Sequence, residues 1–216
     1  MEAFVIFVLV AAANIALAVL ASQQAKKRRM ALAAWASSRG LAFDPSRERQ
    51  MDERYPEFGC LRQGGYAYNV ILGHVGGRPI SAFDYRWEAA GRARVDFSAV
   101  IVGAGVPLKP LVIREGHFFD KAGAFLGFDD IDFESTEFSK AFYVKSPDRR
   151  WAFDVIHQET MEFLLASPRF TLEFQGSDVI ARREWTFKPE DFEAALAVIE
   201  GVLKRLPESL LREMKG

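Results

Sequence analysis

The chain has 216 residues, half of them hydrophobic and 13% aromatic, which is enough for one ordinary domain with a sizeable core and argues against wholesale disorder. Its formal net charge of −1 provides no overall field that would favour nucleic acid or an acidic substrate. Cys60 is the one cysteine, which excludes an intrachain disulfide, a two-cysteine redox motif and a thiolate metal cluster. With no histidine near it in sequence, Cys60 is expected to be an incidental or structural thiol.

The N-terminus carries an apolar run over residues 4–21, in which Asn14 is the one polar side chain. As a helix the run spans about 27 Å, close to the ~30 Å hydrocarbon core of a bilayer. A cleaved secretory signal is the alternative. However, no Lys or Arg precedes the run, which also exceeds the ~7–15 residues usual for a signal. We therefore predict a transmembrane anchor at residues 1–24.

A basic cluster follows the apolar run directly and consists of Lys26, Lys27, Arg28 and Arg29. Because positive residues stay on the cytoplasmic side, we expect a single-pass protein of the cell inner membrane, with its N-terminus outside and its domain in the cytoplasm. A second interpretation is that these four side chains face the lipid and attract anionic headgroups. The cluster is thus predicted to determine topology, to contact lipid, or both.

The anchor helix is expected to continue into a juxtamembrane helix over residues 25–43. Nothing in the sequence breaks the helix before Gly40, which is a natural C-cap. Asp44 and Pro45 then resemble the N-cap and first residue of a short second helix that ends at about Arg54.

The next segment is predicted to form an antiparallel meander. Residues 66–87 have the pattern of two strands joined at Gly76-Gly77, and residues 94–102 that of a third strand. Pro107 and Pro110 are expected to bracket a turn before a fourth strand. The second strand alternates Phe83, Tyr85 and Trp87 with Ala82, Asp84 and Arg86, which predicts one aromatic and one polar face.

The second half is predicted to hold a strand, a helix, a hairpin and a last helix. Residues 142–145 are strand-like, Ser146-Pro147-Asp148 begins a helix that runs to about Ala166, and Gly176 is the centre of a hairpin. The last helix opens at Lys188-Pro189. It carries an apolar stripe of Phe192, Leu196, Ile199 and Leu203.

Together these elements predict a single α+β domain over residues 44–206, followed by a short amphipathic tail at residues 207–216. The expected architecture is an antiparallel sheet, made of a meander plus a C-terminal hairpin and packed with two to three helices, behind a single transmembrane helix.

The sequence offers no strong motif for catalysis, cofactor or metal binding, and we expect no cofactor. The three histidines lack the spacing of a zinc site, and there is no nucleophile elbow or phosphate-binding loop. Within the acidic run of residues 129–135, Asp130, Asp132 and Glu134 match the first three ligand positions of a calcium loop. The glycine and the closing glutamate of that loop are both missing, so these carboxylates are weak metal candidates. Ile131 and Phe133 are expected to face the core.

Residues 125–206 resemble a recurrent segment of uncharacterised bacterial membrane-anchored domains of unknown function. The shared pattern is an acidic stretch, then Glu-Phe-x-x-x-Phe-x-Val-x-Ser-x-Asp, then a helix with an apolar pair and a methionine. The matching positions are Glu137, Phe138, Phe142, Val144, Ser146, Asp148, Ala152, Val155, Ile156 and Met161. Members often carry Thr-Pro after the apolar pair, where this chain has His157-Gln158. The resemblance implies a fold and membrane attachment, and no activity.

Three functional hypotheses are compatible with these features. The first is a non-enzymatic, membrane-tethered module of the bacterial envelope that binds a protein partner and no nucleic acid. The second is a hydrolase or transferase whose site combines Asp84, Arg86 and the acids near residue 130. The third is a peripheral lipid-sensing domain. A pocket in which the named polar groups converge would favour the second hypothesis.

Overall fold

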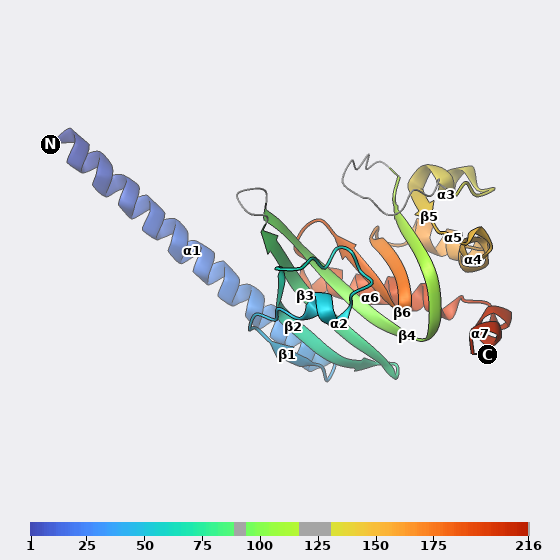
Figure 1. Cartoon of the computed structure of the whole chain (residues 1–216). Coiled ribbons are helices and arrows are strands. Elements are labelled where there is room, and N and C mark those ends of the chain that lie inside the picture. The colour runs from blue at the N-terminus through green and yellow to red at the C-terminus, as the bar shows by residue number, and fades with distance from the viewer. Residues whose placement is uncertain (89–93, 117–130, 216) are drawn as a thin grey trace.

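The computed structural model describes residues 1–88, 94–116 and 131–215 (Figure 1). Within these ranges six strands form one antiparallel sheet in the order β1-β2-β3-β4-β5, with β6 also paired to β4. The predicted α+β class, with an N-terminal helix and an antiparallel meander, is confirmed. The elements are α1 (Glu2–Ser38), β1 (Ala42–Asp44), α2 (Met51–Arg54), β2 (Tyr66–Val75), β3 (Arg78–Glu88), β4 (Arg94–Glu115), α3 (Thr136–Ala141), β5 (Phe142–Lys145), α4 (Arg149–Val155), α5 (Gln158–Ala166), β6 (Thr171–Arg183), α6 (Pro189–Lys204) and α7 (Glu208–Lys215).

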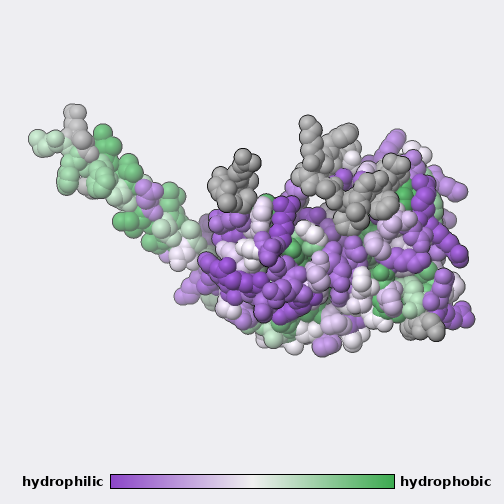
Figure 2. Space-filling model, viewed as in Figure 1, coloured by the Kyte–Doolittle hydropathy of each residue, from purple (hydrophilic) through white to green (hydrophobic). Residues whose placement is uncertain are grey.

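The helix α1 is continuous from the apolar run into the domain, as predicted. It ends at Ser38 and not at the predicted residue 43, because Gly40 adopts a left-handed conformation with φ of 67° and the next residues form β1, which was not predicted. The amides of Gly40 and Leu41 donate to the carbonyls of Ser37 and Ala36, at 3.1 and 2.9 Å, which closes the helix end. The apolar half of α1 extends away from the rest of the molecule and is hydrophobic on the side in view (Figures 1 and 2).

The hairpin between β2 and β3 forms as the sequence predicts. Gly76 and Gly77 have φ of 57° and 77°, and Val75 pairs with Arg78 across the two-residue turn. Both central residues of such a turn require positive φ, which only glycine adopts readily. This turn sets the register of β2 against β3.

The long strand β4 curls the sheet. It pairs with β3 as far as Val102 and with β5 from Val112 onwards, while β6 follows it along its other edge. The register shifts twice between Gly103 and Leu111, and Gly105 has φ of 73°. These bulges bend β4 and β6 together, so that each strand has two arms.

Two predictions for the strands β4 and β6 differ from the structure. Pro107 and Pro110 do not bracket a turn but lie inside β4, in a stretch that pairs with neither β3 nor β5 and whose pairing with β6 is interrupted by two register shifts, and proline is tolerated at such bulges and unpaired edges. Gly176 bends β6, but both arms of β6 pair with β4 and not with each other. The predicted turn at Gly176 is therefore a bend within one strand and not the loop of a hairpin.

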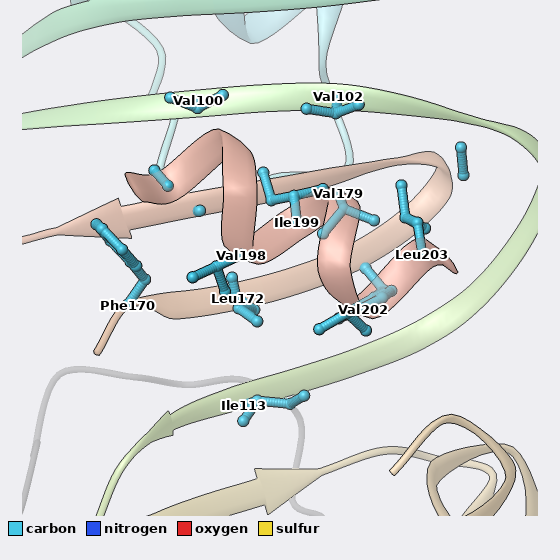
Figure 3. Close-up of a cluster of buried hydrophobic side chains, with 14 of the residues drawn as sticks. Val100, Val102, Ile113, Phe170, Leu172, Val179, Val198, Ile199, Val202 and Leu203 are labelled. Carbon is cyan, nitrogen blue, oxygen red and sulfur yellow. The ribbon is translucent and has the colours of Figure 1, made fainter. Parts of the chain in front are cut away.

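The helix α6 occupies the concave side of the curled sheet, between its two arms (Figure 3). The predicted stripe is confirmed, since Phe192, Leu196, Ile199 and Leu203 are all at most 3% exposed. The arms contribute small and branched side chains to the same cluster, among them Val100, Val102, Ile113, Leu172 and Val179 (Figure 3). Burial of this apolar surface is the main term that holds the domain together.

The opposite face of the sheet is covered by α2 and the segment that follows it. Phe83, Tyr85 and Phe97 form a second buried cluster with Met51 and Phe58. The predicted aromatic face of β3 is therefore correct. On the face predicted to be polar, Ala82 and Asp84 are also buried, because α1 and α6 cover them, while Arg86 is half-buried.

Two predicted helices differ from the structure. The short helix is α2 alone, because Asp44 ends β1 and accepts a hydrogen bond from the amide of Ser46 at 2.8 Å, an Asx turn in place of a helix cap. The helix after β5 is split into α4 and α5, with Asp148 as the N-cap of α4. The helix is interrupted at His157, whose Nε2 lies 2.8 Å from the carbonyl oxygen of Arg205. The short α3 was not predicted.

Candidate functional site

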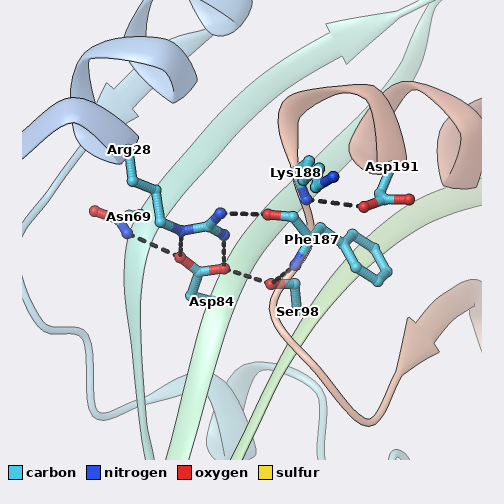
Figure 4. Close-up of polar contacts among 7 residues, drawn as sticks. All are labelled: Arg28, Asn69, Asp84, Ser98, Phe187, Lys188 and Asp191. Carbon is cyan, nitrogen blue, oxygen red and sulfur yellow. Dashed lines mark hydrogen bonds and ion pairs between the residues drawn. The ribbon is translucent and has the colours of Figure 1, made fainter. Parts of the chain in front are cut away.

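A buried carboxylate on β3 lies at the base of α1. Asp84 is fully buried and accepts two hydrogen bonds from Arg28, from Nε at 3.0 Å and from Nη2 at 2.6 Å (Figure 4). Asn69 Nδ2 donates a third bond at 2.8 Å, and the Ser98 hydroxyl donates a fourth. We call Arg28, Asn69, Asp84, Ser98 and Phe187 the Asp84 node.

The main chain before α6 completes the Asp84 node. Arg28 Nη1 donates to the carbonyl of Phe187, and the amide of Phe187 donates to Ser98 Oγ at 2.8 Å (Figure 4). The next residue, Lys188, caps α6 through a bond from its amide to Asp191 at 2.9 Å. The node therefore connects α1, three sheet strands and the start of α6, and four hydrogen-bond donors surround its buried carboxylate.

The local backbone explains why Asn69 reaches Asp84. Asn69 has φ of 52° and lies at a register shift between Tyr68 and Ile71 in β2. Asparagine tolerates this left-handed conformation better than most residues. The bulge turns the Asn69 side chain toward Asp84, and its Oδ1 is buried without a hydrogen-bond partner in the described structure.

A second set of contacts holds α1 closer to its C-terminal end, at Trp35 and Arg39. Trp35 Nε1 donates to Glu193 at 3.2 Å, Arg39 forms an ion pair with the same carboxylate, and the Trp35 and Phe192 rings lie 5.8 Å apart. Leu32, between the two contacts, is fully buried. From Arg28 to Arg39 the helix rises about 16 Å, so α1 is fixed at two separated points and cannot swing freely.

The four residues of the basic cluster fall into two groups. Lys26, Lys27 and Arg29 are exposed, which is compatible with contact to lipid or with a role in topology. Arg28 is turned toward the sheet, and its charge is neutralised by Asp84. The lipid-facing prediction is therefore wrong for Arg28, because the buried carboxylate competes for its guanidinium.

A basic pocket lies at the end of the sheet where β2 begins and β3 ends. Its lining is polar and is formed by Arg47, Arg49, Gly64, Tyr66, Arg86 and Glu88. Arg86 donates to Asp96 at 2.6 Å and to the Tyr66 hydroxyl at 3.3 Å. Asp84, although on the same face of β3, does not line this pocket.

Two of the predicted metal candidates, Asp132 and Glu134, are not brought together with other ligands of the described residues. Asp130 lies outside the described residues, while Asp132 and Glu134 are exposed. In the part of the chain that the structure describes, no three His, Cys, Asp or Glu side chains are placed to hold an ion. Ile131 and Phe133 are 3% and 8% exposed and belong to the main core, as predicted.

The remaining reactive side chains have structural surroundings. Burial of the Cys60 thiol raises its pKa to about 12, so that almost no thiolate is present at neutral pH. His74 is exposed on β2, and His157 contacts the end of α6; His117 lies outside the described residues.

The enzyme hypothesis needed Asp84, Arg86 and the acids near residue 130 to converge. Asp84 is saturated by its donors, and Arg86 faces a different pocket with Asp96. The segment before α3, which carries Asp132 and Glu134, lies at the opposite end of the sheet from α1 (Figure 1). As far as the structure describes them, these groups do not form one site.

Comparison with solved structures gives one similar fold. The crystal structure of the mycobacterial trehalose monomycolate transport factor A, TtfA, matches with a TM-score of 0.65 over 83% of this chain and 96% of that chain, at 15% identity. The chain shares the fold of TtfA. No family model matches the sequence, and no curated protein does. The resemblance of residues 125–206 to membrane-anchored domains therefore stays a prediction.

The sequence did not predict the Asp84 node. Arg28 was assigned to the membrane boundary and Asp84 to a polar sheet face, and the two are 56 residues apart in the chain. One signal was available, since Asp84 is flanked by the aromatic residues Phe83 and Tyr85 and shares its face with Ala82. A small apolar neighbour on that face indicates that something packs on it.

Proposed function

We propose that this protein is a non-enzymatic interaction module of the bacterial envelope, anchored by α1 in the inner membrane with its N-terminus outside and its domain in the cytoplasm. The observation that carries the proposal is that the first part of α1 is apolar and exposed, whereas its last part is attached to the domain. Its stretch Leu9–Ser38 contains an 18-residue window with a mean hydropathy of 1.2 that is 0% buried. The helix then enters the domain and is fixed there by the Asp84 node and Glu193.

Such an arrangement serves to hold a domain at a set distance and orientation from a bilayer. A flexible linker would suffice for simple attachment, whereas α1 reaches the domain as one unbroken helix. TtfA, which has the same fold, is named as a transport factor. By analogy we propose that this chain also assists an envelope machine by binding a protein partner in the same membrane.

The anchoring part of the proposal is tested with the full chain. Wild-type protein is expected to resist alkaline carbonate extraction from membranes. Leu9→Lys/Leu17→Lys is expected to release it, because each charge in mid-bilayer costs about 2.5 to 3.5 kcal/mol. A matched Lys26→Gln/Lys27→Gln variant should still insert. Release of the wild-type chain would contradict the anchor. A reporter at the C-terminus that is active only outside the cytoplasm would, if active, contradict the orientation.

The partner is tested by photo-crosslinking in native membranes. Trp185 is 57% exposed and Phe153 is 41% exposed, which makes both suitable for a photoreactive replacement. We expect a discrete adduct from at least one site that persists at high salt. Absence of any adduct from both sites, in a chain that remains inserted, would argue against a stable protein partner on these surfaces.

A further inference from the structure

Two arginines line the outer edge of β2 at the end of the sheet beside α1. Glu48 forms a two-bond bridge with Ala67, with both N···O distances at 2.8 Å. Since side chains alternate along an extended segment, Arg47 and Arg49 point to the face opposite Ala67, which is buried under α2. Their guanidinium carbons lie 4.7 and 5.9 Å from the centroid of the Tyr66 ring.

Neither of these arginines is neutralised. Arg47 and Arg49 are exposed and form no ion pair with any carboxylate of the described residues. Arg86, on the neighbouring strand, is already paired with Asp96. The pocket that these three arginines line contains one acidic side chain, Glu88. Two guanidinium groups oriented on one aromatic ring are suited to a phosphate, which they can bind with paired hydrogen bonds.

The position of this pocket along α1 follows from the Asp84 node. Arg28 is level with Asp84, and β3 continues from there to Glu88, toward the side on which α1 leaves the domain (Figure 1). Four strand residues span about 13 Å, which equals about nine residues of helix. The end of β3 therefore lies level with a point on α1 between residues 19 and 28.

That interval contains the boundary between the apolar run, which ends at Ala21, and the exposed Lys26, Lys27 and Arg29. In a spanning helix this boundary lies at the headgroups. Hydrophilic side chains also gather on the domain surface next to α1 (Figure 2). The fixed attachment of α1 thus brings the arginine pocket to the level of the lipid phosphates.

We infer that Arg47, Arg49 and Tyr66 form a binding site for the phosphate of an anionic lipid headgroup. The inference rests on the proposed function in one respect, that α1 spans the bilayer. Lys26, Lys27 and Arg29 supply the general attraction to the anionic leaflet, and the pocket holds one headgroup against the sheet. With α1 fixed to the domain, the bound lipid adds a second attachment to the membrane beside the spanning helix.

The test is a lipid titration of the full chain in a non-ionic detergent, followed by native mass spectrometry. Phosphatidylglycerol is expected to bind, and phosphatidylcholine to bind more weakly. Arg47→Gln/Arg49→Gln should weaken phosphatidylglycerol binding by about tenfold or more, because it removes both charged donors to the phosphate. The matched control is Arg149→Gln/Arg150→Gln, which removes two exposed arginines from α4 and should leave the affinity unchanged. Thermal melts establish that both variants fold.

Equal phosphatidylglycerol affinity in Arg47→Gln/Arg49→Gln and wild type would overturn the inference, as would equal binding of phosphatidylcholine. Inorganic phosphate forms the third arm. If it displaces phosphatidylglycerol at equal concentration, the site is one for free phosphate and the lipid assignment is wrong. Because the titration needs no bilayer, it fails independently of the carbonate extraction that tests the anchor.

Discussion

Two helices pack on the concave face of the same sheet, and they are held there by different physics. The helix α6 presents an apolar stripe that is buried between the arms of β4 and β6 (Figure 3). The helix α1 presents few apolar side chains to the sheet and is held by the Asp84 node and Glu193 (Figure 4). Hydrophobic burial tolerates small shifts, whereas a bidentate ion pair fixes an orientation. The burial of α6 therefore stabilises the domain without fixing a precise orientation, whereas the polar contacts of α1 fix the orientation of that helix relative to the sheet.

Because α6 is held by hydrophobic burial, we expect the largest loss of stability from a substitution in its apolar stripe. Ile199→Ala removes a fully buried side chain from α6 and should lower the free energy of unfolding by about 3 to 4 kcal/mol. Urea denaturation of the full chain in detergent measures this. Ala197→Ser, on the exposed side of α6, is the control and should have little effect. A loss below that of the Arg28 variant would reverse the proposed order.

Arg28→Met tests the polar attachment and should cost about 3 kcal/mol, because Asp84 is left buried without its cation. The value lies at the low end of the range for such pairs because Arg28 is 25% exposed. The neighbouring Arg29→Met removes an exposed arginine from the same cluster and should change stability by no more than about 0.5 kcal/mol.

The double variant Arg28→Met/Asp84→Met tests whether the loss in Arg28→Met comes from the unpaired buried charge of Asp84. It removes both charges, so it should recover most of the stability that Arg28→Met loses. If the two single variants at Arg28 and Arg29 behave alike, Arg28 belongs with the lipid-facing residues after all.

Ser98→Ala should have a smaller effect, of about 2 kcal/mol, because it leaves the buried amide of Phe187 without an acceptor and removes one donor from Asp84. Ser38→Ala is the matched control, since that hydroxyl is exposed and bonds only to the carbonyl of Trp35. The same denaturation experiment compares the two. An equal change at both positions would show that Ser98 contributes nothing specific to the node.

The same contrast explains what the sequence could predict. The stripe of α6, the Gly76-Gly77 turn and the end of α1 at Gly40 are local patterns, each determined within a few residues, and each was predicted correctly. The path of β4 was not, because whether a proline ends a strand depends on the edge at which its missing N–H would lie. That edge is known only when the positions of β3 and β5 are known.

The candidate site was harder to predict than the fold for the same reason. Arg28 meets Asp84 across 56 residues and Phe187 across 159, and no periodicity within the chain encodes such a pairing. A cluster of four basic residues after an apolar run has a sufficient explanation in the positive-inside rule. That explanation concealed that one of the four belongs to the domain core, and only the three-dimensional structure separates Arg28 from its neighbours.

The smallest predicted effect concerns Cys60, on the opposite face of the sheet from both helices. Desolvation raises its pKa to about 12 in the folded protein, against 9.0 for an unperturbed thiol. Between these values the native state binds one proton more than the unfolded state, so stability falls as the pH rises. From pH 7 to pH 10 the loss should be about 1.4 kcal/mol.

Denaturation of wild type and Cys60→Ala at pH 7 and pH 10 measures this difference. The variant should lack the cysteine's share of the pH dependence, whereas the share of the tyrosines, with a reference pKa of 10.0, is the same in both chains and cancels in the comparison. An equal pH dependence in the two chains would show that the partly buried thiol titrates in the folded protein as it does in the unfolded chain, and would contradict its desolvation in the packing under α2.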